Sequence, residues 1–238
     1  LTHGATVHGS QFIDPEKRKD PTSYYHRSGP VGDLFVALLE REEEKRVAVI
    51  GLGAGAVASY AQPDLQLTFY EIDPQVEMIA RDARFFEYLA LPGSRCKVVI
   101  GDGRLGIQQA EAGSFDMILL DAFSSGTIPV HLLTKEAVQT YLSKLAPGGF
   151  LAFHISNHFL NLTPALSSIA SELGLRILER EDRHAFYGKE AAHYAVMLPP
   201  TSHPKFLEQH PVWKQISPEQ TTQVWTDEYS NLTSLVKW

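Results

Sequence analysis

Residues 46–62, RVAVIGLGAGAVASYAQ, place an apolar strand, a glycine turn and a helical segment in direct succession. The run RVAVIGL (46–52) is typical of a buried strand, and AVASYAQ (56–62) has the period of a helix behind it. The glycines between them let the backbone approach a ligand and leave the N–H groups of the helix N-terminus free. This stretch therefore predicts the first strand-helix unit of a ligand-binding sheet.

The same alternation of strand and helix continues along the chain. Further strands are predicted at 65–73, 96–102, 115–123, 150–156, 175–181 and 193–199, and helices at 74–89, 103–112, 134–145 and 162–173. Strands that alternate with helices predict an α/β fold whose mostly parallel sheet is covered on both faces. Such sheets bind ligands beyond the carboxyl ends of their strands.

The two flanks of the chain differ from this pattern. Residues 1–30 predict a short β-hairpin followed by a polar loop, and residues 31–200 form the sheet domain. Residues 201–238, which are rich in Pro, His and Gln at their start, predict a segment that wraps the surface. Within the sheet domain, APGG (146–149) predicts a turn, and Thr134 is expected to cap a helix.

Composition narrows the class of protein. The 238 residues carry 21 Lys and Arg against 28 Asp and Glu, and the net charge of −7 argues against nucleic-acid binding. The single cysteine, Cys96, excludes a disulfide framework and a cysteine-rich metal site. The longest apolar runs are too short to cross a bilayer, and no signal segment opens the chain. Because the first residue is Leu1 rather than Met, we expect a fragment of a longer polypeptide.

Glycines and an acid follow the first two predicted strands. Gly51, Gly53 and Gly55 form the glycine turn, and Gly51, Gly53 and Ala56 also fit the dinucleotide-binding fingerprint. Glu71 ends the second strand, twenty residues after Gly51, where an acid can accept from two ribose hydroxyls. A role in helix capping fits Asp73, which precedes Pro74, better than it fits Glu71.

Acids also follow the next two strands. Asp102 lies between glycines, so its carboxylate can accept from an adenine amino group while Gly103 leaves room for the ring. On its own, Asp102 is equally consistent with a turn aspartate. Asp121 ends a strongly apolar strand, and a carboxylate there is costly to desolvate unless it is paired or faces a ligand. Together these residues predict an adenosine site whose reacting end faces Asp121.

The chain resembles the spermidine synthase, or polyamine aminopropyltransferase, family. The resemblance rests on HGSQ (8–11), YYHR (24–27), IGLGAGA (50–56), YEIDP (70–74), GDGR (101–104), LLDAFSS (119–125) and LAPGGFLAFH (145–154). It implies the Rossmann-like fold of S-adenosylmethionine-dependent methyltransferases. TDEYSNL (226–232) resembles a subgroup in which this domain follows membrane-spanning segments, which implies a cytoplasmic domain attached to a membrane region.

The resemblance also implies roles for individual residues. Glu71 would bind the ribose and Asp102 the adenine amino group, while Gln11 and Tyr25 would line the pocket around the sulfur and the transferred chain. Asp121 would be the catalytic acid residue. The co-substrate would be decarboxylated S-adenosylmethionine, with an amine as acceptor and no metal or prosthetic group. Relatives commonly form homodimers.

Two departures from the family pattern affect the acceptor end of the site. Ala54 stands where the family has an aspartate in its glycine loop, and Ser124 stands where it has a second catalytic-segment aspartate. Both losses remove charge that would hold a diamine. Four interpretations stay open: transfer to a different or less charged amine held partly by Asp227 and Glu228, cyclisation of S-adenosylmethionine without an external acceptor, methyl transfer, and a non-catalytic domain that senses the nucleoside.

The histidines are not expected to bind a metal. His154 and His158 have a spacing that could hold a metal on a helix, but they fall at a strand end and in its loop. No third ligand of suitable type lies nearby in the sequence. Structural roles are predicted for His8, His131, His184 and His193.

Overall fold

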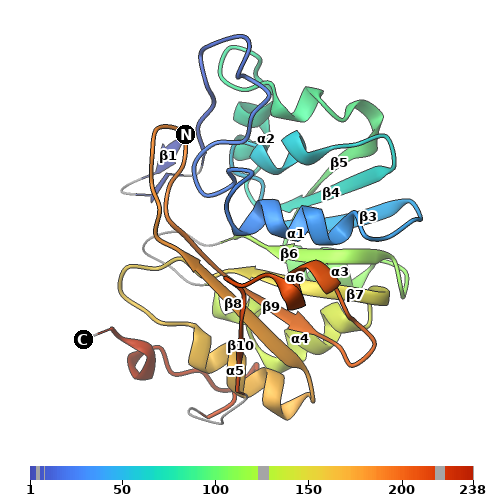
Figure 1. Ribbon diagram of the computed structural model, residues 1–238, viewed down its shortest axis with the longest axis vertical. Coiled ribbons are helices and arrows are strands. Elements are labelled where there is room, and N and C mark those ends of the chain that lie inside the picture. The colour runs from blue at the N-terminus through green and yellow to red at the C-terminus, as the bar shows by residue number, and fades with distance from the viewer. Residues whose placement is uncertain (4–5, 8, 123–128, 218–222, 238) are drawn as a thin grey trace.

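The structure, a computed structural model, describes residues 1–3, 6–7, 9–122, 129–217 and 223–237. Its centre is a sheet of eight strands in the order β10-β8-β9-β7-β6-β3-β4-β5 (Figure 1). The strands are β3 (Lys45–Ile50), β4 (Leu65–Glu71), β5 (Cys96–Ile100), β6 (Phe115–Leu120), β7 (Leu145–His154), β8 (Arg176–Asp182), β9 (Ala192–Leu198) and β10 (Lys214–Ile216). The first five of these are mutually parallel, whereas β9 is antiparallel to β7 and β8, and β10 is antiparallel to β8. The predicted mostly parallel α/β sheet is confirmed.

Helices cover both faces of this sheet (Figure 1). They are α1 (Pro30–Leu38), α2 (Pro74–Arg81), α3 (Gly103–Gln108), α4 (Lys135–Leu142), α5 (Thr163–Glu172), α6 (Lys205–Gln209) and the short 3-10 helices η1 (Ala56–Tyr60), η2 (Tyr88–Ala90), η3 (Gly93–Arg95), η4 (Val130–Leu132) and η5 (Thr233–Leu235). Alternate residues of a strand point to opposite faces. Val47 and Val49 of β3 therefore join the core under α1, whereas Ala48 and Ile50 join the core under α4 and α5. All six residues of β6 are buried, as expected for a central strand.

Three predicted elements have different bounds in the structure. The helix predicted at 74–89 ends at Arg81, because Asp82 has an extended backbone and its carboxylate accepts from the backbone N–H of Arg84. The helix predicted at 56–62 is the 3-10 helix η1. The turn predicted at 146–149 lies inside β7: the register opposite Phe115 and Met117 jumps from Leu145 to Phe150, so these residues form a bulge. The predicted cap at Thr134 is confirmed, since its side chain accepts from the N–H of Ala137.

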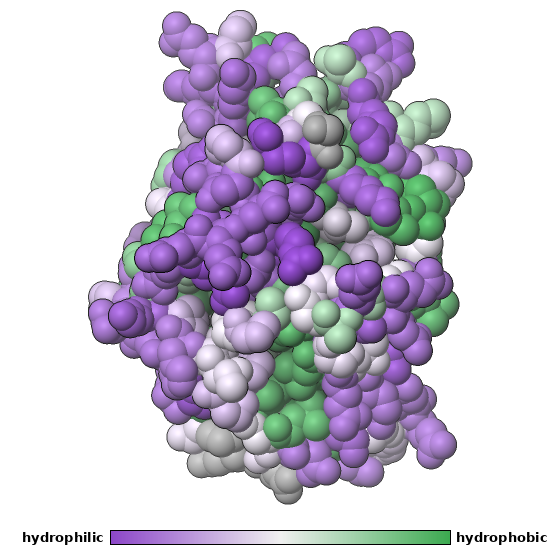
Figure 2. Space-filling model, turned by 90° about the vertical axis from the view of Figure 1, so that its right-hand side faces the viewer, coloured by the Kyte–Doolittle hydropathy of each residue, from purple (hydrophilic) through white to green (hydrophobic). Residues whose placement is uncertain are grey.

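The flanking segments attach to the sheet in different ways. The predicted N-terminal hairpin is confirmed as β1 (Thr2–His3) paired with β2 (Thr6–Val7). The segment 201–238 covers the surface only in part: it adds β10 to the sheet edge and buries Trp213 and Trp225. None of the helices in the described ranges has the length and apolar character needed to cross a membrane. Figure 2 shows one face of the molecule, where hydrophilic residues surround separate hydrophobic patches.

Candidate active site

Four strand ends meet at one edge of the sheet, on the side where the N-terminus lies (Figure 1). This edge borders a cavity of about 210 Å³. Of the residues singled out from the sequence, the cavity is lined by Tyr25, Gly51, Gly53, Glu71, Asp102, Gly103 and Asp121. Apolar side chains from β3, β4 and the segments beside them complete its walls. Because parallel strands end at the same edge, residues far apart in sequence share one site.

Glu71 ends β4 beside the glycine turn and is buried. Its Oε2 accepts from the N–H of Leu52 at 2.9 Å, and its Oε1 accepts from the N–H of Asp73 at 3.0 Å. A carboxylate offers about four acceptor positions. Two backbone donors therefore fix the orientation of Glu71 and leave acceptor capacity for hydroxyls in the cavity.

Asp102 follows β5 and caps helix α3. Its Oδ1 accepts from the N–H of Leu105 at 2.9 Å, as an N-cap aspartate does. Its Oδ2 lies 3.1 Å from Nε2 of His131, which also lines the cavity. The capping bond holds Oδ1, so Oδ2 is the oxygen that can exchange His131 for a donor on a ligand.

Two glycines allow the strand ends to approach one another closely. Gly51 has a φ of +101°, and a Cβ added there would lie 2.5 Å from the carbonyl oxygen of Asp121. A Cβ at Gly103 would lie 2.5 Å from Cγ2 of Ile50. Real Cβ atoms are not found at such distances from a backbone oxygen, so a side chain at Gly51 would push the ends of β3 and β6 apart.

Asp121 is held by two side-chain donors. Tyr25 donates its hydroxyl to Oδ2 at 2.5 Å, and Nδ1 of His154 lies 2.7 Å from Oδ1. Only 5% of the Asp121 side chain is exposed. Burial, and then the negative charge of Asp121, raise the pKa of Tyr25 well above its ordinary value. Tyr25 therefore stays a protonated donor across the usual pH range.

His154 contacts Asp121 in this site, a role that was not predicted from the sequence, where the residue was considered only as a metal ligand. Its ring is stacked on Tyr194 with centroids 4.6 Å apart and planes at 10°, and it also contacts Tyr24 at 4.5 Å. The signal was present in the sequence, because His154 ends β7 next to β6, where Leu120 is paired with Phe153. The strand-end reasoning that selected Asp121 applies equally to His154. In the described ranges, no group of three His, Cys, Asp or Glu residues is arranged to hold a metal.

Several predicted residues lie elsewhere. The Gln11 amide donates to the carbonyl of Arg18 and accepts from the N–H of Glu87, and Gln11 does not line the cavity. Gly55 also lies outside the lining, and a Cβ there would meet Leu89 at 3.0 Å. Ala54 is fully buried.

The acceptor end of the site was also expected to involve Asp227, Glu228 and Ser124. Arg104 donates to both carboxylate oxygens of Asp227, and Asp227 does not line the cavity. The structure therefore does not place Asp227 at the acceptor end, where it was expected to hold the amine. Glu228 is exposed and does not line the cavity either. Ser124 lies outside the described residues.

Comparison with known proteins supports the resemblance seen in the sequence. No protein-family profile matches the chain. The chain is similar to a polyamine aminopropyltransferase of Vibrio vulnificus, with 31% identity over 153 residues that cover 62% of this chain and 48% of the other. It is also similar to putrescine N-methyltransferase 3 of Nicotiana tabacum, with 28% identity over 123 residues that cover 50% of this chain and 32% of the other. The chain thus spans about half, or less, of the length of these curated relatives.

Solved structures share the fold. A probable spermidine synthase from Corynebacterium glutamicum superposes with a TM-score of 0.63 at 19% identity, over 85% of this chain and 80% of that one. Spermidine synthase from Thermotoga maritima gives a TM-score of 0.53 at 15% identity, over 82% of this chain and 66% of that one. The chain therefore has the Rossmann-like, methyltransferase-type fold that was predicted, and over part of its length it is similar in sequence to a polyamine aminopropyltransferase.

Proposed function

We propose that this protein transfers an aminopropyl group from decarboxylated S-adenosylmethionine to an amine and releases methylthioadenosine. The observation that carries the proposal is the placement of Asp121, buried and bonded by Tyr25, on the wall of the cavity that Glu71 and Asp102 also line. A carboxylate at that position can hold an ammonium group and take its proton. The similarity to the Vibrio vulnificus aminopropyltransferase supports the same reaction class.

Each acid has a separate task in this reaction. Glu71 accepts from the ribose hydroxyls, and Asp102 accepts from the adenine amino group with the oxygen that now contacts His131. These two contacts place the sulfonium at the reacting end of the cavity, where the acceptor meets Asp121.

The chemical step is a displacement at carbon. Asp121 removes a proton from the acceptor ammonium, and the freed nitrogen lone pair attacks the methylene carbon next to the sulfonium. The C–N bond forms as the C–S bond breaks, and the bonding electrons pass to sulfur. Methylthioadenosine then leaves as an uncharged molecule. Tyr25 keeps its proton and holds Oδ2 of Asp121 in place during the step.

A second candidate is intramolecular cleavage of S-adenosylmethionine, in which its own carboxylate or amine attacks the γ-carbon. The observation in its favour is the small number of acids at the reacting end. Among the described lining residues, the carboxylates are Glu71, Asp102 and Asp121, and the first two are assigned to the nucleoside. Ala54 is buried outside the cavity lining and supplies no charge for a diamine.

Product analysis by mass spectrometry tests both candidates. The protein is incubated with decarboxylated or intact S-adenosylmethionine, each with and without putrescine. Methylthioadenosine formed only from the decarboxylated donor plus amine is the expected result. Methylthioadenosine from intact S-adenosylmethionine alone would establish the second candidate. S-adenosylhomocysteine would mean methyl transfer, and nucleoside binding without any product would mean a sensing domain; either result contradicts the proposal.

A further inference from the structure

We propose that His154 is a positioning residue that holds the Asp121 carboxylate through its Nδ1–H group. The effect of this role on turnover rests on the proposed function. The contact between His154 and Asp121 does not, because it is a feature of the folded chain. His154 ends β7 and Asp121 follows the adjacent strand β6. Their side chains meet with Nδ1 of His154 2.7 Å from Oδ1 of Asp121, and both side chains are less than one-tenth exposed, at 7% and 5%.

The Asp121 carboxylate requires a proton on Nδ1 of His154, because an ionised carboxylate only accepts hydrogen bonds, and Ser156 can complement that arrangement at Nε2. Nε2 of His154 lies 2.7 Å from Oγ of Ser156, and the N–H of His193 donates to that same Oγ at 2.8 Å. With one lone pair of Ser156 used by His193, its hydroxyl proton can point to Nε2. In this arrangement His154 accepts at Nε2 and donates from Nδ1 to Asp121.

Aromatic contacts hold the imidazole ring in one orientation. Tyr194 is stacked on the ring at 4.6 Å, and Tyr24 packs at 4.5 Å with its plane tilted by 35°. A ring flip that would present another atom to Asp121 has to displace these neighbours. The donor at Oδ1 is therefore as fixed as the Tyr25 hydroxyl at Oδ2.

Two fixed donors leave Asp121, which lines the cavity, with a defined set of free acceptor positions. Without His154, the carboxylate can rotate about its bond to Cβ, and its free lone pairs no longer point at the incoming nitrogen. A misplacement of about 1 Å costs on the order of 100-fold in rate in such sites. The loss falls on turnover rather than on nucleoside binding, because Glu71 and Asp102 are untouched.

A pair of substitutions separates this role from simple packing. In His154→Asn the amide nitrogen can occupy the position of Nδ1 and donate to Asp121, whereas in His154→Gln the amide reaches toward the position of Nε2. We expect His154→Gln to lower kcat about 100-fold, with methylthioadenosine binding unchanged by calorimetry, and His154→Asn to recover at least about tenfold of that loss. The assay is methylthioadenosine release from decarboxylated S-adenosylmethionine with putrescine. His158→Gln, an exposed position in the loop beyond β7, is the matched control.

Equal losses in the Asn and Gln variants, or wild-type kcat in both, would overturn the positioning role. A second measurement does not depend on turnover. In protein labelled with ¹⁵N-histidine, we expect His154 to be protonated at Nδ1 and unprotonated at Nε2, and Asp121→Asn to move its resonances more than those of the other histidines. An Nδ1 signal without a proton, or one that Asp121→Asn leaves in place, contradicts the pairing. If the pairing is found but no donor and amine react, the proposed function fails and the pairing stands.

Discussion

At the scale of single residues, Asp121 is a buried carboxylate whose proposed role requires it to accept a proton. Its carboxylate accepts from Tyr25 and His154 while keeping acceptor capacity toward the cavity. In Asp121→Asn one oxygen becomes an amide nitrogen, which donates and cannot take a proton from an ammonium group. We expect the variant to lose at least about 100-fold in turnover, the usual contribution of a general base, with methylthioadenosine affinity nearly unchanged. Mass spectrometry of products and calorimetry measure the two quantities.

Asp73→Asn is the matched control for this change. Asp73 also follows a strand of the same sheet, but its carboxylate caps α2 by accepting from Gln75, and Asn caps helices about as well. Turnover in Asp73→Asn should match the wild type. If Asp121→Asn kept wild-type turnover as well, Asp121 would not be the base.

Glu71 is a second residue whose charge has a specific use. In Glu71→Gln, the amide nitrogen must face the N–H of Leu52 or of Asp73, or else turn into the cavity as a donor. Each arrangement removes an acceptor from the ribose or from the backbone. We expect methylthioadenosine affinity to fall by about 1–3 kcal/mol, the range for hydrogen bonds to charged groups. Calorimetry measures this loss, with Glu77→Gln on α2 as control; equal affinities in the two variants would remove Glu71 from the ribose role.

The positions of three predicted site residues are fixed by strand ends. Glu71, Asp102 and Asp121 lie where parallel strands stop, and the sheet brings such positions together whatever the rest of the chain does. Gln11, in contrast, belongs to a loop and does not line the cavity, and its amide is hydrogen-bonded to the backbone of Arg18 and Glu87. Contacts of that kind depend on tertiary packing, which no local pattern in the sequence encodes.

At the scale of secondary-structure elements, the separation of β3 and β6 is set by Gly51. The N–H of Asp121 donates to the carbonyl of Ile50 at 2.8 Å, and Gly51 lies directly against the Asp121 backbone. Gly51→Ala combines an unfavourable left-handed backbone, at about 1–2 kcal/mol, with a clash that moves one strand end. We expect a larger loss of unfolding free energy than the backbone alone explains, together with lost methylthioadenosine binding. Denaturant unfolding and calorimetry measure both.

Gly174→Ala separates the cost of a positive φ at a non-glycine residue from the cost of the steric clash at Gly51. Gly174 also has a positive φ, of +66°, but a Cβ there meets nothing within 4 Å. This variant should lose only about 1–2 kcal/mol and keep its ligand affinity. Equal unfolding free energies in the Gly51 and Gly174 variants would mean that the strand ends can separate without cost.

The last segment of the chain is tied to α3 and α4 by an ion pair that responds to pH. Arg104 binds both oxygens of Asp227 at 2.7 Å, and Thr134 donates to the same carboxylate. The hydrogen bonds from Arg104 lower the pKa of Asp227 to about 2. Since the folded-state pKa is depressed, the stabilisation is present above the unfolded value of about 3.9 and is lost as the pH falls toward about 2.

We therefore expect Asp227→Asn to lower stability by no more than about 1 kcal/mol near neutral pH, because the pair is partly exposed to solvent. The difference in Tm between this variant and the wild type should stay constant above about pH 5 and shrink below about pH 4. Thermal unfolding across this range measures it, with the exposed neighbour substitution Glu228→Gln as control. A difference that grows toward acid would contradict the assigned direction of the pKa shift.

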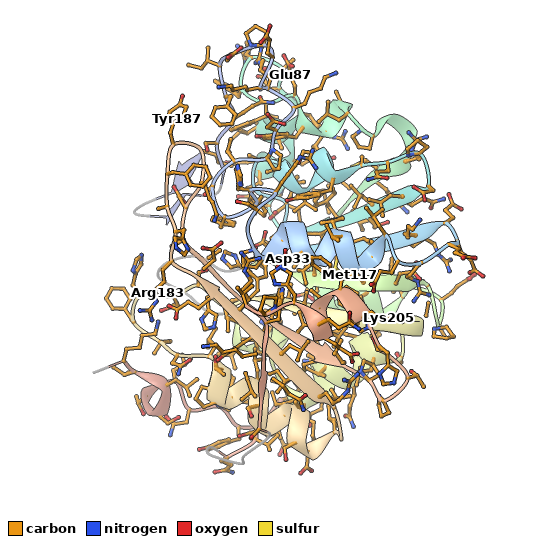
Figure 3. All side chains as sticks on the ribbon, viewed as in Figure 1. Asp33, Glu87, Met117, Arg183, Tyr187 and Lys205 are labelled. Atoms are coloured by element: carbon orange, nitrogen blue, oxygen red, sulfur yellow. The ribbon has the colours of Figure 1, made fainter. Side chains whose placement is uncertain are left out.

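At the scale of the whole molecule, single contacts join segments that are distant in sequence. Ser23 and Lys189 form a β-bridge, and Phe12 contacts Tyr187 with ring centroids 5.6 Å apart (Figure 3). Asp33 on α1 accepts from Arg180 on β8 and from the indole of Trp213, which ties the C-terminal segment to both (Figure 3). The sheet was predictable from the alternation of strands and helices along the chain. The contacts between the flanking segments and the sheet were not. They arise from single pairs of residues, which have no periodic signal in the sequence.

Because the cavity draws on four strand ends and on the N-terminal segment, a bound nucleoside should stabilise the whole fold. At about 100 times Kd, a ligand that binds only the folded state adds about 2.7 kcal/mol. Each kcal/mol raises Tm by about 2–4 °C in a domain of this size, so methylthioadenosine should raise Tm by roughly 5–10 °C. Scanning fluorimetry with increasing ligand measures the shift.

The matched ligand is methylthioinosine, which replaces the adenine amino group by a carbonyl oxygen. Oδ2 of Asp102 cannot accept from that oxygen and repels it, so methylthioinosine at the same concentration should give little or no rise in Tm. Asp102→Asn supplies an amide that can cap α3 with its oxygen and donate with its nitrogen. The variant should therefore lose the discrimination between the two nucleosides. If the wild type were stabilised equally by both, Asp102 would not contact the base, and the nucleoside would lie in the cavity in another orientation.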